Sequence, residues 1–220
     1  MTTLILTPTP LELDTLEPLL SPSVRELDGW FELCGFGPVA AAARTMQLLA
    51  KHQPTQVILV GIAGGLQPSL AVGTARCFRR VACDGIGAGT GSSHKSAGEI
   101  GWKHWAPVSS AGSAGQTSLG DALPLAPQLV GPSELGGVLL TVCAASANTS
   151  DVAMRRERYP DASAEDMEGF GVAVACHFGD VPLQIIRGIS NHAGDRDKNN
   201  WRIHQALNAA SDLTLKILST

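Results

Sequence analysis

Four short segments place residues able to do chemistry where a strand of a parallel sheet would end or a helix would begin. Glu12 follows the first apolar run of the chain by five residues, and Gly61-Ile62-Ala63-Gly64-Gly65 follows a later run. Three acids surround a methionine in Ala164-Glu165-Asp166-Met167-Glu168-Gly169, and a polar stretch, residues 190–201, opens with Ser190 and Asn191. Parallel sheets bind ligands beyond the carboxyl ends of their strands, so all four segments are candidates for a ligand site.

Each segment also has a purely structural explanation. Glu12 could be a solvated carboxylate that is stabilised by the positive end of a helix dipole. The glycine segment could form a tight turn. The glycine spacing is G-x-x-G-G rather than the dinucleotide fingerprint G-x-G-x-x-G, and Pro68 interrupts the helix that should follow. Carboxylates are common in first helical turns, but an acid buried beside Met167 needs a partner such as a hydroxylated ligand. The charged residues after Asn191 could form local turns and ion pairs, or they could bind a ligand.

Histidines and cysteines show no metal-binding pattern. The six histidines occur without HxH or HxxxH spacing, and the five cysteines form no CxxC pair. The cysteines lie among apolar residues, which indicates reduced thiols in a core. We therefore expect no metal, no cofactor and a cytoplasmic location.

Composition excludes several classes of protein. The 220 residues, 44% apolar and 16% charged, suffice for one sizeable core and not for two ordinary catalytic domains, so we expect a single domain over residues 1–220. A net charge of −4 argues against nucleic acid or an anionic membrane as partner. The apolar runs fall short of the roughly 20 residues that span a bilayer, and the first residues lack the basic part of a signal peptide.

Apolar runs and helical periodicity predict an α/β fold with a largely parallel sheet covered by helices. Strands are predicted at residues 3–7, 30–34, 56–60, 73–83, 137–143 and 183–189. Helices are predicted at 10–20, 39–51, 167–178 and 200–218, with a further helix capped by Thr149 or Ser150 and running to Tyr159. Residues 84–136 are rich in Gly, Ser and Pro and predict an elaborated functional loop or a flexible segment.

Taken together and in order, the motifs resemble one family. They are Glu12 after the first strand, Gly35-x-Gly37-x-Val39-Ala40-Ala41-Ala42, Gly61-x-Ala63-Gly64-Gly65-Leu66, Asp166-Met167-Glu168-Gly169 and Ile189-Ser190-Asn191. This set resembles the nucleoside phosphorylase and nucleosidase superfamily, on the branch of the methylthioadenosine/adenosylhomocysteine nucleosidases. Ser190-Asn191-x-x-Gly194-x-Arg196-Asp197-x-x-x-Trp201 is similar to the narrower group of futalosine hydrolases, nucleosidases of the alternative menaquinone pathway. The likeness covers nearly the whole chain except residues 86–136.

The resemblance implies a three-layer α/β/α fold with a central mixed sheet, and a homo-oligomer in which a neighbouring subunit borders the pocket. It assigns catalysis to three residues: Glu12 would orient or deprotonate a water, Glu168 would bind the ribose hydroxyls, and Asn191 would meet the purine. Met167 would line the sugar, and Gly64-Gly65 would lie near the water and ribose. Ala63, Asp166 and Ser190 complete the implied substrate-binding set.

The reaction implied is hydrolysis of the N-ribosidic bond of a purine nucleoside. Ile62 stands where relatives commonly have Ser or Thr, and its side chain cannot hydrogen bond, which favours water over phosphate as nucleophile. Adenine-releasing relatives usually present an aspartic acid at the position of Asn191; an amide cannot act as an acid but can donate to N7 or a 6-oxo group. We therefore predict a futalosine hydrolase that releases hypoxanthine. The alternatives are a methylthioadenosine/adenosylhomocysteine nucleosidase, a purine nucleoside phosphorylase and, more remotely, a non-catalytic nucleotide-binding module.

Overall fold

The central sheet is built from short apolar runs that pack on both of its faces. The computed structural model describes residues 2–107, 117–126 and 130–219. In β1 (Thr3–Thr7), Leu4 and Leu6 join one apolar core and Ile5 joins another, because successive side chains of a strand point to opposite faces. A sheet buried on both faces is what continuous apolar runs predict.

The sheet is mixed and partly closes on itself. Within the described residues its other strands are β2 (Trp30–Leu33), β3 (Gln56–Gly65), β4 (Ala75–Asp84), β7 (Ala122–Pro124), β8 (Leu135–Val142), β9 (Ala162–Asp166) and β10 (Leu183–His192). Their order is β10-β4-β8-β9-β3-β1-β2, with β7 beside β4. Because β10 also pairs with β3, the strands β3, β10, β4, β8 and β9 form a closed ring. The pairs β4–β10, β3–β9 and β4–β7 are antiparallel, and the others in this sheet are parallel.

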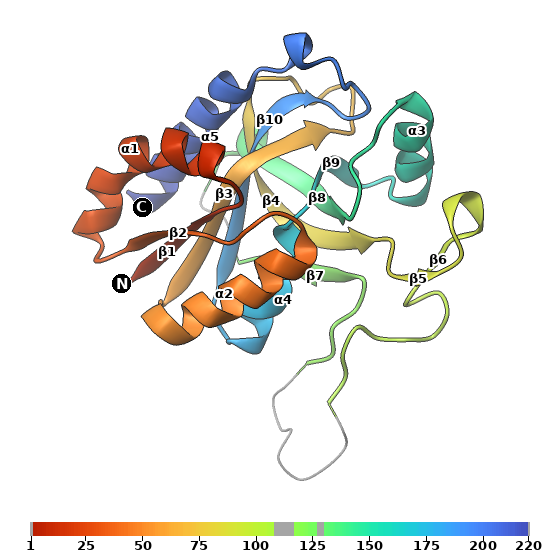
Figure 1. Cartoon of the computed structure of the whole chain (residues 1–220), viewed down its shortest axis with the longest axis horizontal. Coiled ribbons are helices and arrows are strands. Elements are labelled where there is room, and N and C mark those ends of the chain that lie inside the picture. Colours follow the sequence, from red (N-terminus) through yellow and green to blue (C-terminus); the bar gives the residue numbers. More distant parts are fainter. Residues whose placement is uncertain (1, 108–116, 127–129, 220) are drawn as a thin grey trace.

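Helices cover both faces and complete three layers (Figure 1). α1 (Pro10–Glu26) and α5 (Ile203–Leu218) pack on one face, and α2 (Pro38–His52) and α4 (Gly169–Phe178) on the other. α3 (Thr149–Arg158) lies beside a third, smaller apolar cluster. The predicted α/β/α architecture is confirmed. None of the helices in the described part of the chain has the length and apolar character that crossing a membrane requires.

Three predicted boundaries near the functional motifs are wrong, and all three concern strands. The strand predicted to end at residue 189 continues to His192 as β10. Residues 162–166, expected to lead into a helix that starts at Met167, form β9, and α4 begins only at Gly169. The segment Ala-Ser-Ala-Glu-Asp lacks the β-branched residues that mark strands, and its pairing with β8 and β3 makes it one. The glycine segment 61–65, expected as a turn, continues β3 because Gly64 and Gly65 pair with β9 and β10.

Two helix boundaries also differ from the prediction. α1 runs to Glu26 although Pro18 and Pro22 lie within it. The N-cap of α3 is Asn148, whose side chain accepts from the backbone of Ser150 and Asp151, in place of the predicted Thr149 or Ser150.

The predicted loop, residues 84–136, holds little regular structure where it is described. It contains β7 and a small hairpin of β5 (Gly87–Ala88) and β6 (Lys95–Ser96). Asp121 ties the segment together by accepting from Ser96 Oγ, the Gly98 amide and His104. Residues 108–116 and 127–129 of this prediction lie outside the described residues.

Four of the five cysteines occupy the core, as predicted, but the prediction is wrong for Cys143, which is exposed. Burial raises the pKa of the Cys34, Cys77, Cys83 and Cys176 thiols to about 12. These four thiols therefore stay protonated near neutral pH and serve packing rather than nucleophilic chemistry.

Candidate active site

Eight of the nine predicted site residues line one cavity of about 230 Å³, at the ends of β3, β9 and β10. They are Glu12, Ala63, Gly64, Asp166, Met167, Glu168, Ser190 and Asn191. The ninth, Gly65, is not part of the lining; it is buried in the sheet, paired with Ala164 and His192. A larger hollow of about 920 Å³ near the end of α4 contains none of the predicted residues.

Glu12 is fixed in the cavity wall by a capping box at the start of α1. Thr9 N and Oγ1 donate to Glu12 Oε2 at 3.0 and 2.6 Å, and the Ile62 amide donates to Glu12 Oε1 at 2.9 Å. The residue is only 3% exposed. This burial excludes the purely structural explanation, in which Glu12 is a solvated carboxylate at the start of a helix. Three donors leave the carboxylate one of its roughly four acceptor positions. Glu12 can therefore take one further hydrogen bond inside the cavity.

Arg187 is the residue that sequence reasoning missed. It lies within β10, is fully buried, and donates to Asp166 Oδ2 from Nε at 3.1 Å and from Nη2 at 2.6 Å. Its Nη2 also lies 3.3 Å from Glu168 Oε2. The sequence does contain a signal for it, because Arg187 is the single cation in the largely apolar run Leu183-Gln184-Ile185-Ile186-Arg187. A buried charge requires partners of opposite sign, so this position predicts nearby carboxylates.

The remaining nitrogen of Arg187 faces Glu12. Arg187 Nη1 is buried and has no hydrogen-bond partner among the described residues. A side chain at Gly61 would collide with both Arg187 Nη1 and Glu12 Oε1, so the absence of a Cβ there lets these two atoms lie close together. A donor without a partner and an acceptor with a free position thus adjoin each other.

Glu168 precedes α4 and lies 5% exposed in the cavity wall. Its Oε1 accepts from the Gly37 amide at 3.1 Å. Burial raises the pKa of Glu168 to about 7; Arg187 opposes this rise, and the nearby Asp166 and Glu12 carboxylates add to it. The charge of Glu168 consequently changes near neutral pH.

Asp166 serves mainly to hold other groups. Its Oδ1 accepts from Thr141 Oγ1 at 2.6 Å, and its Oδ2 accepts from the Gly169 amide and from Arg187. The residue therefore joins the end of β9 to the start of α4 and orients the guanidinium, although it also lines the cavity.

Asn191 is held by its own loop. Its Nδ2 donates to the carbonyls of His192 at 2.8 Å and Asp195 at 3.4 Å, and its Oδ1 accepts from Ser190 Oγ at 2.8 Å. Trp201 Nε1 donates to the same Asp195 carbonyl. The amide thus braces residues 190–201 and presents to the cavity mainly its remaining acceptor capacity. The donation to N7 or a 6-oxo group that the sequence predicts would require Asn191 to exchange one of these bonds.

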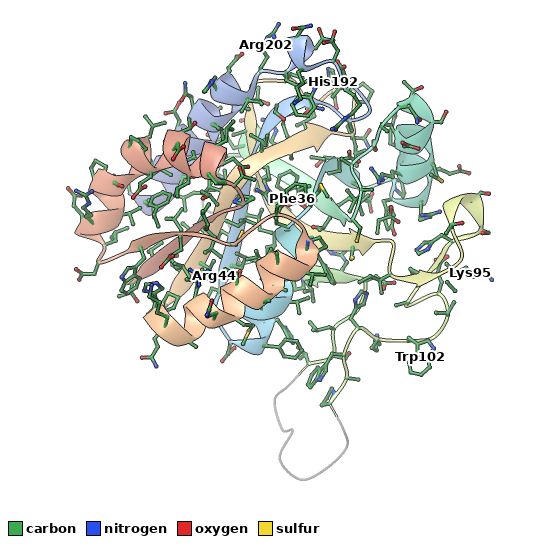
Figure 2. The ribbon with its side chains drawn as sticks, viewed as in Figure 1. Phe36, Arg44, Lys95, Trp102, His192 and Arg202 are labelled. Carbon is green, nitrogen blue, oxygen red and sulfur yellow. The ribbon has the colours of Figure 1, made fainter. Side chains whose placement is uncertain are left out.

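The cavity wall also contains residues that were not predicted as site residues. Phe36 lies between β2 and α2 (Figure 2), lines the cavity and is 65% exposed. Its neighbours Gly35 and Gly37 have φ of +89° and +83°, a conformation that favours glycine. Ser146 and Glu165, both buried, line the cavity on the side of β9.

Comparison with known proteins gives the family. Residues 30–220 match the family model described as the phosphorylase superfamily. This chain belongs to the phosphorylase superfamily. Membership makes it an enzyme, as predicted, rather than a non-catalytic nucleotide-binding module.

Individual members of the superfamily differ in their likeness to this chain. A futalosine hydrolase of Streptomyces coelicolor is 34% identical over 86% of this chain and 79% of its own length. A 5′-methylthioadenosine/S-adenosylhomocysteine nucleosidase of Shewanella frigidimarina is 28% identical over 80% and 74%. The solved structure of such a nucleosidase from Colwellia psychrerythraea, in complex with adenine, aligns with a TM-score of 0.79 at 22% identity, covering 100% of this chain and 95% of the other.

Proposed function

We propose that this enzyme is a purine nucleosidase that hydrolyses the N-ribosidic bond of futalosine, releasing hypoxanthine and dehypoxanthine futalosine. The observation that carries the proposal is that Glu12 and Glu168 line one cavity and that both lie next to the buried guanidinium of Arg187. The 34% identity to a futalosine hydrolase supports the substrate. We further propose that it acts in menaquinone biosynthesis, as the resemblance to futalosine hydrolases implies, and in the cytoplasm, as the pattern of cysteines suggests.

The nucleophile in this proposal is a water held between Glu12 Oε1 and Arg187 Nη1. The water accepts from the otherwise unpartnered guanidinium nitrogen and donates to the free acceptor position of Glu12. As its oxygen bonds to C1′ of the ribose, its proton passes to Glu12. The electron pair of the breaking C1′–N9 bond goes to the purine, which leaves as the anion and takes up a proton from solvent, while Glu12 returns its proton to solvent. General base assistance of this kind contributes about two to four powers of ten in rate.

Glu168 stabilises the sugar in the transition state. Breaking the bond places positive charge on the ribose, as in glycoside hydrolysis. A buried carboxylate beside the ribose hydroxyls opposes that charge, and the low local dielectric strengthens the interaction. Met167 borders the same part of the cavity and packs against the sugar.

The first prediction concerns the products. Incubating the enzyme with futalosine, aminofutalosine, methylthioadenosine and inosine, with and without phosphate, should release base fastest from futalosine. The sugar product should be unphosphorylated at C1, and phosphate should not change the rate, because Ile62 offers no hydroxyl to an anion. Identification of the products by mass spectrometry measures both.

Either alternative gives a different result in the same experiment. A requirement for phosphate together with a sugar 1-phosphate product would identify a phosphorylase. Fastest release of adenine from methylthioadenosine would identify a methylthioadenosine/adenosylhomocysteine nucleosidase, the activity named for the Shewanella frigidimarina relative.

We also propose that the enzyme is a homo-oligomer whose contact runs along α2. Val39, Ala43, Met46 and Ala50 are exposed at helical spacing, so this helix presents an apolar stripe to solvent beside Phe36. Val39 is 82% exposed. Apolar patches of this kind mark contact surfaces.

The second prediction tests this surface. Molar mass from light scattering should correspond to two or more chains, and Val39→Glu combined with Met46→Glu should reduce it to one chain, because charge opposes burial of the stripe. Gln47→Glu, an exposed change on the same helix, should leave the mass unaltered. A wild-type mass of one chain contradicts the proposal.

A further inference from the structure

Three residues at the strand ends form a row across the sheet. Gly64 of β3 pairs with Asn191 of β10 on one side and with Glu165 of β9 on the other. Neighbouring strands lie about 4.8 Å apart, so the backbones of Asn191 and Glu165 are separated by about 10 Å. Paired residues project to the same face of a sheet, and all three line the same cavity.

Gly64 leaves a gap in the middle of this row. A Cβ added there would lie only 3.4 Å from Ala193 Cα and 3.5 Å from Glu165 Cγ. Gly64 itself places no side chain between Asn191 and Glu165. The row therefore forms a slot with an amide at one end and a carboxylate at the other.

The carboxylate end is fixed by a network that the proposed reaction does not use. Glu165 is 4% exposed and accepts from Ser146 N at 2.8 Å, from Ser146 Oγ at 2.7 Å and from Arg155 Nη1 at 2.5 Å. Arg155 also lies 3.6 Å from Asp84. These three donors orient the carboxylate and leave one acceptor position.

The two ends of the slot differ in what they can distinguish. Both amide hydrogens of Asn191 are engaged by backbone carbonyls of its own loop, so Asn191 offers a purine chiefly an acceptor. Glu165 likewise accepts only. A base in this slot is therefore favoured when it presents N–H groups, and disfavoured where it presents a ring lone pair.

We infer that Glu165 selects the leaving base by accepting a hydrogen bond from N1–H of a 6-oxopurine; the inference rests on the proposed nucleosidase activity. A 6-oxopurine carries hydrogen on N1, whereas a 6-aminopurine has a lone pair there that faces the carboxylate unfavourably. Glu165 is thus a specificity-determining residue, and Ser146 and Arg155 position it. The substrate class is a 6-oxopurine nucleoside.

The test compares futalosine with aminofutalosine in three enzymes. Wild type should prefer the 6-oxopurine, and Glu165→Gln should lower the ratio of the two kcat/KM values at least about tenfold, because the new amide can donate to N1 of the aminopurine. Glu157→Gln, the same change at an exposed position of α3, should leave the ratio unaltered. Calorimetric titration with free hypoxanthine and adenine should show that Glu165→Gln shifts relative affinity in the same direction, toward adenine.

A fourth enzyme separates selection from mere support of the loop. Ser146→Ala removes one of the three hydrogen bonds to Glu165, and one from Arg155, but keeps the Glu165 carboxylate, so it should retain the preference for the 6-oxopurine. If Ser146→Ala and Glu165→Gln depress both substrates equally, with unchanged ratios, Glu165 only holds the loop and the inference is wrong. If wild type releases neither base, the proposed function itself is wrong.

Discussion

Replacing Glu168 by glutamine is expected to lower kcat at least about a hundredfold while the protein stays folded. Glutamine keeps the size of the side chain and still accepts from the Gly37 amide, but it brings no negative charge to the ribose. Charge that develops only in the transition state affects kcat more than substrate binding. Steady-state kinetics on the preferred nucleoside, with circular dichroism as the check on folding, measures the loss.

Glu12→Gln is expected to lose activity to a similar extent for a different reason. Glutamine cannot take the proton of the attacking water, yet it is accepted at this position of a capping box, so α1 should form normally. Glu17→Gln, an exposed change on the same helix, should keep the wild-type rate. A rate close to wild type in Glu12→Gln or Glu168→Gln would contradict the catalytic role of that residue and leave it only a structural one.

The raised pKa of Glu168 should make the free energy of unfolding depend on pH. Its pKa of about 7 in the folded protein exceeds the ordinary 4.5 because burial disfavours the charged form. Protonation therefore favours the fold below about pH 4.5, and this contribution is lost as the pH rises through 7. Since each tenfold change in proton affinity corresponds to about 1.4 kcal/mol, the total is about 3 kcal/mol. Urea unfolding at several pH values should show wild type losing stability relative to Glu168→Gln over this range.

Arg187→Met is expected to lower the free energy of unfolding by about 3–5 kcal/mol. Methionine fills part of the volume, but Asp166 and Glu168 then stay buried without their cation. Removing one partner of a buried ion pair is costly because the other charge remains away from water. Urea unfolding of wild type and variant measures the difference.

Two further variants make this prediction specific. Arg156→Met removes an exposed arginine from α3 and should change stability by less than about 0.5 kcal/mol. Adding Asp166→Asn to Arg187→Met should recover part of the lost stability, because it removes one unpaired charge. A small loss in Arg187→Met alone would contradict the buried carboxylate cluster.

The local features of this fold are readable in the sequence. Apolar runs predict most strands because a strand buried on both faces needs apolar residues at successive positions. The alanine-rich segment 39–51 predicts α2 within one residue at each end. Thr9-x-x-Glu12 is a capping-box spacing that marks the start of α1 and could have predicted the local partner of Glu12.

The motifs also predict which residues meet in the cavity. Glu12, Glu168 and Asn191 lie in three segments, and strand ends of a largely parallel sheet collect at one edge. Residues 162–166 are an exception: their composition indicates no strand, and they form β9 because they pair with β8 and β3.

The contacts that give the cavity its chemistry depend on distant parts of the chain. Arg187 meets Asp166 and Glu168 across about twenty residues, and Glu12 meets Ile62 across fifty. Local propensity reports the conformation of a few neighbouring residues, whereas the pairing of buried charges depends on strand register and on which side chains closure of the sheet brings together. The sequence therefore predicts which acids belong to the site. The partners of Arg187, and the position of Glu165 opposite Asn191, are determined only by the packing of the sheet.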